Sequence, residues 1–263
     1  MASRTAGWFL SRPGYVFLTV DQKGLLAYPP GHFAKAWVGL LIVSLGWSMA
    51  AIGIYSAAWM LFGEPMGRLM PAALVAGTFV MWPFRRALAS MLNILFPSEP
   101  NARALAGAVF LLVLTLGLLS LKRDFRHDSY LAPVIVWIRP WFKLYRPIVL
   151  MPLWGAWAML IVPQFCRHGA KTLPQVAAFA KGCRPFSAAV VMGLLLALTI
   201  TYFNFLGWRQ LSILASALVG SGLSGVMFCR FEGGLTRRAL LSANVLTQLI
   251  FLLACLATCN LVV

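Results

Sequence analysis

AWVGLLIVSLGWSMAAIGIYSAAWMLF, residues 36–62, decides the fold of this chain. The stretch contains no charged side chain. A helix needs about 20 apolar residues to cross the hydrocarbon core of a bilayer, so this stretch is long enough to span a membrane. Similar blocks recur along the 263 residues, of which 61% are hydrophobic and only 11% are charged. Because soluble domains carry roughly 25% charged residues, we expect a single membrane domain over 36–263.

Seven apolar blocks are predicted to be membrane-spanning helices, so the expected fold is an all-α, multi-pass bundle. They cover residues 36–62, 69–84, 104–121, 147–165, 186–206, 210–229 and 239–263. The second block is the shortest. It is either a short span or a re-entrant hairpin with residues 87–96, since Pro97 and Pro100 end that apolar run.

Residues 1–35 form an amphipathic lead-in to the first span. The segment YVFLTVDQKGLLAY within it is compatible with a small hairpin, because Gly24 suits a left-handed turn position after Asp21. An interfacial helix over residues 5–11 is the alternative. In both cases Trp8, Phe9 and Phe17 are expected to anchor the segment at the membrane interface.

The basic residues predict the orientation of the bundle. The net charge is +16, and seven spans place 14 of the 22 Lys and Arg residues on the side that holds the N-terminus. Omitting the second span divides them 11 to 11 and removes the bias. Because Lys and Arg are enriched in cytoplasmic loops, we expect the N-terminus inside and the C-terminus outside, in an inner (cytoplasmic) membrane. Basic loops beside a bilayer indicate contact with anionic lipids rather than with nucleic acid.

Residues 131–146 interrupt this pattern with a basic and aromatic segment. Arg139, Lys143 and Arg146 recur at helical spacing, and aromatic and apolar side chains fill the neighbouring positions. This pattern is typical of a helix that lies in the headgroup plane. Binding of lipid headgroups or of another anionic ligand by these three residues is the sharper hypothesis.

The stretch LKRDFRHDSY, residues 121–130, is a candidate metal site. Asp124, His127 and Asp128 would share one face of a helix, and carboxylate with imidazole can bind a divalent cation. Lys122, Arg123 and Arg126 lie among them, however, so the local field opposes a cation. We therefore interpret the stretch as a charged loop and expect neither a bound metal nor a cofactor.

A stripe of small residues marks the sixth span. Ser212, Ser216, Gly220 and Ser224 recur every four residues, which is the pattern by which membrane helices approach closely. The overlapping sequence Gly222-Leu223-Ser224-Gly225 resembles the motif of intramembrane serine proteases, but no histidine follows Ser224 to serve as its base. We expect the four stripe residues to pack helices together.

The remaining polar groups within the spans are uncharged. Asn244 and Gln248 share one face of the last span and are expected to form interhelical hydrogen bonds. Residues 239–263 contain no lysine, which excludes a retinal Schiff base in the last helix. The five cysteines form no CxxC pair, so a disulfide framework is not expected.

These features favour a non-catalytic subunit of a larger membrane assembly, with other membrane subunits as partners. Small-residue helix faces suit helix packing, and basic loops suit acidic partner surfaces and anionic lipid. The alternative is a permease or channel component for a neutral or anionic solute or lipid. A lipid-modifying enzyme that uses Asp124, His127 and Asp128 is the third hypothesis.

Overall fold

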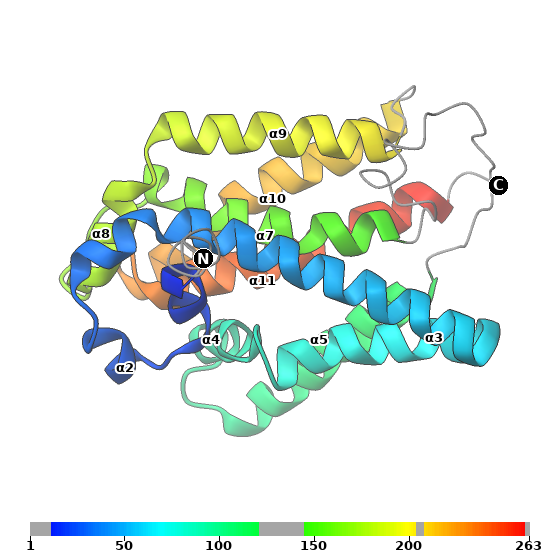
Figure 1. The fold of residues 1–263 in the computed structure, drawn as a ribbon. Helices are drawn as coiled ribbons and strands as arrows, with labels where there is room; N and C mark the ends of the chain where they lie inside the picture. Colours follow the sequence, from blue (N-terminus) through cyan, green and yellow to red (C-terminus); the bar gives the residue numbers. More distant parts are fainter. Residues whose placement is uncertain (1–11, 121–144, 204–207, 261–263) are drawn as a thin grey trace, which may run out of the picture.

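The computed structural model describes residues 12–120, 145–203 and 208–260, and these ranges contain helices but no strand. A helical stretch over 12–19 comes first. The elements that follow are α2 (Gln22–Leu26), the 3₁₀ helix η1 (Pro30–Lys35), α3 (Ala36–Val80), α4 (Arg85–Leu95), α5 (Pro100–Ser120), α7 (Tyr145–Phe165), α8 (Pro174–Gly182), α9 (Pro185–Phe203), α10 (Trp208–Glu232) and α11 (Arg237–Asn260). Figure 1 shows the long helices running along one common direction.

Six helices among the described residues are long and apolar enough to cross a membrane. They cover Pro30–Gly63, Pro100–Ser120, Arg146–Phe165, Pro185–Tyr202, Leu211–Glu232 and Arg237–Thr258. Lengths of 18 residues or more match the thickness of a bilayer. The expectation of an all-helical fold is therefore confirmed for the described residues, and their six apolar helices fit a multi-pass membrane bundle.

The helix α3 reverses its direction at Gly63. This glycine has φ 71° and ψ −165°, a backbone conformation that L-residues with a Cβ rarely adopt. The ring of Trp82 nevertheless lies 6.2 Å from that of Trp47. A straight helix would place these residues roughly 50 Å apart. The two parts of α3, before and after Gly63, therefore run back alongside each other, as Figure 1 shows.

The short helix α4 crosses the direction of the bundle. Figure 1 shows α4 almost end-on, whereas the part of α3 that precedes it is seen from the side. One face of α4, with Ala87, Leu88 and Met91, is buried, and the helix packs mainly against α11. Residues 64–80 and α4 thus do not form the two arms of a hairpin.

The centre of the bundle is α7, which packs against α3, α9, α10 and α11. Nearly all residues from 146 to 160 are buried. Three polar contacts join α7 to its neighbours: Trp154 Nε1 donates to Thr199 Oγ1 (3.2 Å), Trp157 Nε1 to the Ala188 carbonyl (3.0 Å) and Ser48 Oγ to the Val149 carbonyl (3.1 Å). Uncharged polar groups within the spans thus join helices, as hydrogen bonds in lipid commonly do.

The N-terminal segment differs from the sequence-based expectation. Residues 12–19 and 22–26 are helical, so the hairpin interpretation is wrong. Asp21 instead caps α2, because its Oδ1 accepts a hydrogen bond from the Gly24 amide at 2.9 Å. Phe17 is fully buried and does not serve as an interface anchor. The alternative helix over residues 5–11, and with it Trp8 and Phe9, lies outside the described residues.

Candidate functional site

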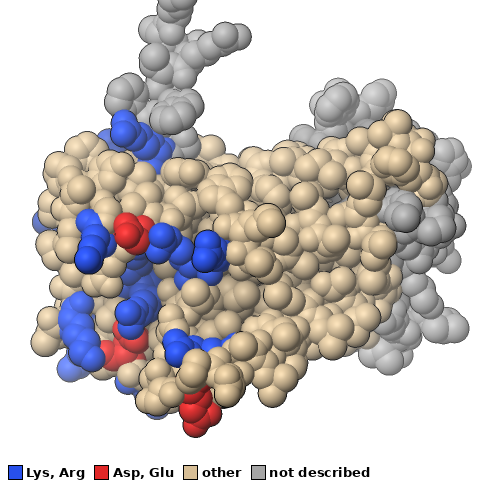
Figure 2. All heavy atoms as spheres, turned by 90° about the horizontal axis from the view of Figure 1, so that it is seen from below, with Lys and Arg blue, Asp and Glu red and all other residues tan. Residues whose placement is uncertain are grey.

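Positive charge gathers at one end of the bundle. Figure 2 shows Lys and Arg side chains over the end that holds α2, α4 and α8 in Figure 1, while the rest of that face is almost free of charge as far as it is described. The basic residues of this end lie in the segments 12–35, 85–103, 166–184 and 230–238. These are the segments that the charge pattern assigns to the cytoplasmic side.

A folded cap closes this basic end. We call residues 12–35 together with α8 the basic cap. Its core is aromatic: Phe17, Phe33 and Phe179 are all buried, and the rings of Phe17 and Phe179 stack with centroids 4.7 Å apart. Stacked aromatic pairs add about 0.5–1.5 kcal/mol beyond the burial of their area. The cap therefore has a core of its own on top of the helices.

Close backbone packing attaches the cap to the first span. A Cβ at Gly14 would overlap backbone atoms of Gly39 in α3, which attaches the cap to the first span. A Cβ at Gly182, the last residue of α8, would overlap the Ala34 carbonyl, which joins α8 to residues 12–35 within the cap. Only glycine permits these approaches. The Gln175 side chain also donates to the Tyr28 carbonyl at 3.2 Å. The cap is therefore a fixed surface.

Arg237 joins the cap to the last span. Its Nε donates to the Phe17 carbonyl (2.8 Å) and its Nη2 to the carbonyls of Phe17 and Val20, the latter at 2.6 Å. The guanidinium carbon lies 5.6 Å from the centre of the Phe17 ring. These carbonyls end the helical stretch 12–19, where the helix dipole favours a cation. The buried charge of Arg237 is thus compensated by structural contacts.

The loops that follow α7 and α10 are joined at the same end. A disulfide links Cys166 to Cys229, whose Cα atoms are 6.2 Å apart. The Leu235 amide donates to the Arg167 carbonyl at 2.9 Å, and Thr172 Oγ1 donates to the Leu235 carbonyl at 2.7 Å. The sequence predicted no disulfide framework, and it did not single out this one pair, because 63 residues separate the two cysteines and no local motif marks them.

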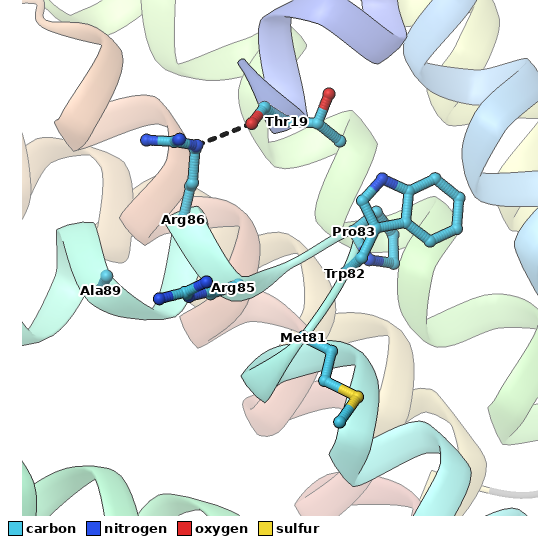
Figure 3. Close-up of a pocket in the computed structure, with 7 residues that line it drawn as sticks. All are labelled: Thr19, Met81, Trp82, Pro83, Arg85, Arg86 and Ala89. Carbon is cyan, nitrogen blue, oxygen red and sulfur yellow. Dashed lines mark hydrogen bonds between the residues drawn. The ribbon is translucent and has the colours of Figure 1, made fainter. Parts of the chain in front are cut away.

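A pocket of about 360 Å³ opens beside the turn between α3 and α4 (Figure 3). Its lining residues are Thr19, Met81, Trp82, Pro83, Arg85, Arg86 and Ala89. Arg86 Nε donates to the Thr19 carbonyl at 2.6 Å, which fixes that guanidinium beside the opening. Figure 3 shows Arg85 and Arg86 on the α4 side, with Arg86 toward Thr19 and Arg85 near Ala89, and Trp82 and Met81 on the other side. The pocket therefore combines two cations with an aromatic and aliphatic wall.

The small-residue stripe faces α11 along much of its length. A Cβ at Gly220 would lie 2.9 Å from Cγ2 of Ile250, so the two helices are in close contact there. Ser224 Oγ lies 3.4 Å from Thr247 Oγ1, and Ser212 Oγ lies 3.2 Å from Thr258 Oγ1. Ser216 is half-buried. These contacts lie within the chain, so at these positions the stripe is occupied by α11 and not available to a partner.

Only one of the residues predicted from the sequence to bind an anion or a metal lies within the described residues. Arg139 and Lys143, and the whole group Asp124, His127 and Asp128, lie outside the described residues. Arg146 is buried in the first turn of α7. Within the described parts of the chain no group of three His, Cys, Asp or Glu side chains is close enough to hold a metal ion.

Asn244 and Gln248 form a polar pair deep in the bundle. Gln248 Nε2 donates to Asn244 Oδ1 at 2.6 Å, and Asn244 Nδ2 contacts the Met159 sulfur at 3.4 Å. Gln248 lies against Gly155 of α7: a Cβ added to Gly155 would lie 2.7 Å from Cγ of Gln248. Gln248 Oε1 is buried and accepts no hydrogen bond from the described residues. Sulfur is a weak acceptor, so this amide pair is incompletely satisfied.

The Arg85–Arg86 pocket is not among the sites predicted from the sequence. A detectable signal was present, because WPFRR places an aromatic residue, a proline and two arginines at the end of an apolar block. The contribution of Thr19 is not visible in the sequence, since it depends on how the cap folds over α4. Comparison with family models, with curated proteins and with solved structures found no match to this chain.

Proposed function

We propose that this multi-pass membrane protein is a non-catalytic subunit whose basic cap docks an acidic surface of a partner subunit. The observation that carries the proposal is the cap itself: a buried aromatic core and glycine contacts hold it rigidly on the helices. Lys23, Lys35, Lys171, Lys181 and Arg184 are all exposed around it. A preorganised surface of one charge favours a partner of opposite charge and accelerates encounter.

The partner is tested on protein extracted gently from its own membrane. Native mass spectrometry should detect the chain in a stoichiometric complex. Lys181→Glu with Arg184→Glu should release the partner, and the charge-conserving Lys181→Arg with Arg184→Lys should keep it. The proposal fails when wild-type protein is recovered only as the isolated chain, or when charge reversal leaves the complex intact.

We further propose seven passes, with the N-terminus and the basic cap on the cytoplasmic side. The part of α3 after Gly63 supports the seventh pass. Its helical residues up to Val80 extend roughly 26 Å, close to the thickness of the hydrocarbon core. The start of α3 and the turn before α4 then lie at the same end, which also holds most of the described Lys and Arg. This agreement with the positive-inside rule supports the orientation.

Transport of a small neutral solute is a second candidate, and Gln248 favours it. A buried amide oxygen without a donor is costly in an apolar setting unless something else supplies the hydrogen bond. The chain reconstituted alone in vesicles should then move such a solute, and Gln248→Leu should abolish the flux. Vesicles with the same solute flux as protein-free controls would exclude this candidate.

The hypothesis of a lipid-modifying enzyme rests on Asp124, His127 and Asp128, which lie outside the described residues.

A further inference from the structure

The start of α4 carries an electrostatic conflict. Arg85 and Arg86 occupy its first two positions, and no acidic residue lies in the first turn. The N-terminus of a helix already has partial positive charge, which disfavours cations. Arg237 adds a third guanidinium nearby, because it and Arg86 bind carbonyls of the same short stretch, Val20 and Thr19. The Asp21 carboxylate is the one acidic group whose charge acts on Arg237 among the described residues, so three cations face a single anion. An anion at this place would relieve the repulsion.

The two arginines differ in how they are held. Arg86 Nε donates its hydrogen bond to the Thr19 carbonyl, which orients the guanidinium. Its two terminal nitrogens then remain to donate to a ligand. Arg85 is exposed and makes no hydrogen bond or ion pair with any residue that the structure describes. Figure 3 shows both side chains on the α4 side of the group of lining residues, facing Trp82 and Met81. Paired guanidiniums with free N–H groups suit the oxygens of a phosphate.

The rim of the pocket is apolar. Met81 is 79% exposed and Trp82 46% exposed, and Val80 beside them is also exposed. The Trp82 ring contacts those of Tyr15 and Trp47, with centroids 5.9 Å and 6.2 Å away. Tryptophan and tyrosine gather at the level of lipid headgroups. Free phosphate would not need such a rim, whereas a lipid places its acyl chains along it.

We propose that this pocket binds the phosphate of one anionic lipid, with Arg85 and Arg86 as ligands and Met81 and Trp82 beside its acyl chains. The volume of about 360 Å³ lies at the lower end of the range for small-molecule pockets, which suits a headgroup. The site does not involve Lys181 or Arg184, so it does not depend on the proposed partner.

The test uses the full chain in nanodiscs of phosphatidylcholine with a small fraction of phosphatidylglycerol. Native mass spectrometry should find one retained phosphatidylglycerol, and added phosphatidylglycerol should raise the melting temperature. Arg85→Gln should weaken retention about tenfold, a loss of ~1.4 kcal/mol. This variant should still fold, because Arg85 has no hydrogen-bond partner in the described structure. Lys181→Gln removes the same charge from the cap and should retain the lipid as wild type does.

Inorganic phosphate added to phosphatidylcholine nanodiscs separates the two sources of phosphate. It should leave the melting temperature unchanged. An equal rise with inorganic phosphate and with phosphatidylglycerol would overturn the assignment to lipid. Equal retention by Arg85→Gln and wild type, or equal weakening in Arg85→Gln and Lys181→Gln, would overturn the site itself, because binding would then follow total charge alone.

Discussion

The indole rings of Trp47 and Trp82 meet edge to face, 6.2 Å apart and at 88°. This contact exists only because α3 turns back at Gly63. Trp82 lies in the pocket wall beside Arg85, so the reversal also positions the proposed lipid site. The number of crossings and the position of the pocket therefore depend on the same turn.

Labelling from the two sides of the membrane tests the crossing by residues 64–80. Single cysteines replace Phe62 and Ser98, which are both exposed, in a variant whose native cysteines are alanine. With a complete crossing, a membrane-impermeant thiol reagent should reach the two positions from opposite sides. Lys171→Cys serves as the control and should behave like Ser98→Cys. Labelling of positions 62 and 98 from the same side would show that residues 64–80 do not cross.

The conformation of Gly63 is tested by adding one methyl group. Gly63→Ala should lower the free energy of unfolding by about 1–3 kcal/mol, because a Cβ is strained at φ 71° and ψ −165°. Gly53→Ala is the matched control. It lies within the same helix, and its Cβ would meet nothing within 4 Å, so it should be neutral or stabilise by up to about 1 kcal/mol. Thermal unfolding in detergent compares the two. Equal melting temperatures would mean that the turn relaxes without strain.

The sequence predicts the helices well because apolar length is a strong signal in a membrane protein. The blocks 36–62 and 104–121 are predicted spans, and the structure is helical over Ala36–Val80 and Pro100–Ser120. The sequence also separates the blocks 36–62 and 69–84, and Gly63, where α3 turns back, lies between them. The fold of the cap could not be predicted in this way. The helices over 12–19 and 22–26 are too short for their pattern alone to indicate a helix, and they are stabilised by packing on Phe33 and Phe179.

The candidate sites were less predictable for a related reason. Spacing along one helix identified the stripe from Ser212 to Ser224, since its members are neighbours in the same helix. The contacts of Arg86 with Thr19 and of Cys166 with Cys229 join residues far apart in the chain. Such contacts depend on tertiary packing, and no periodicity within a single helix encodes them.

Packing of α10 on α11 is tested with two glycines of the same helix. Gly220→Leu should destabilise the protein by about 1–3 kcal/mol, because its Cβ alone would lie 2.9 Å from Ile250. At Gly222 a Cβ meets nothing within 4 Å, so Gly222→Leu should have little effect. The measurement is the melting temperature in detergent. An equal loss at both positions would attribute the effect to the glycines themselves rather than to the contact with α11.

Cys183 is expected to be unreactive in the folded protein. It is buried in the turn between α8 and α9, and burial raises the pKa of its thiol. The reactive thiolate is therefore scarce at neutral pH. Iodoacetamide should modify Cys183 only after unfolding, with mass spectrometry of the peptide as readout. Rapid modification of the native protein at pH 7.5 would contradict this burial.

The same shift predicts a loss of stability in alkali. The unfolded thiol releases its proton at an ordinary pKa of about 8.5, whereas the folded thiol keeps it. Stability from Cys183 is thus complete below that pH and falls as the pH rises above it. Cys183→Ala should reduce the decline between about pH 8.5 and 10. An identical decline in wild type and variant would assign it to other groups.

The Cys166–Cys229 pair tests the orientation of the whole bundle. Disulfides are rare in the cytosol, whereas the topology proposed above puts these cysteines on the cytoplasmic side. The structure therefore represents the oxidised pair. With the cap in the cytosol, we expect both cysteines to be thiols in living cells and to join on oxidation after lysis, because their Cα separation of 6.2 Å suits a disulfide.

Differential alkylation distinguishes these two states by mass. Whole cells are quenched rapidly in acid and alkylated with a first reagent, which marks free thiols. The protein is then reduced and alkylated with a second reagent, which marks cysteines that were joined. Wild-type protein should carry the first alkylating reagent on both cysteines when cells are quenched, and on neither after membranes are treated with copper phenanthroline. Cys229→Ser should leave Cys166 alkylated under both conditions. A pair that is already joined in quenched cells would place the basic end in an oxidising compartment and would reverse the proposed topology, since the cap, the lipid pocket and both cysteines lie at that same end.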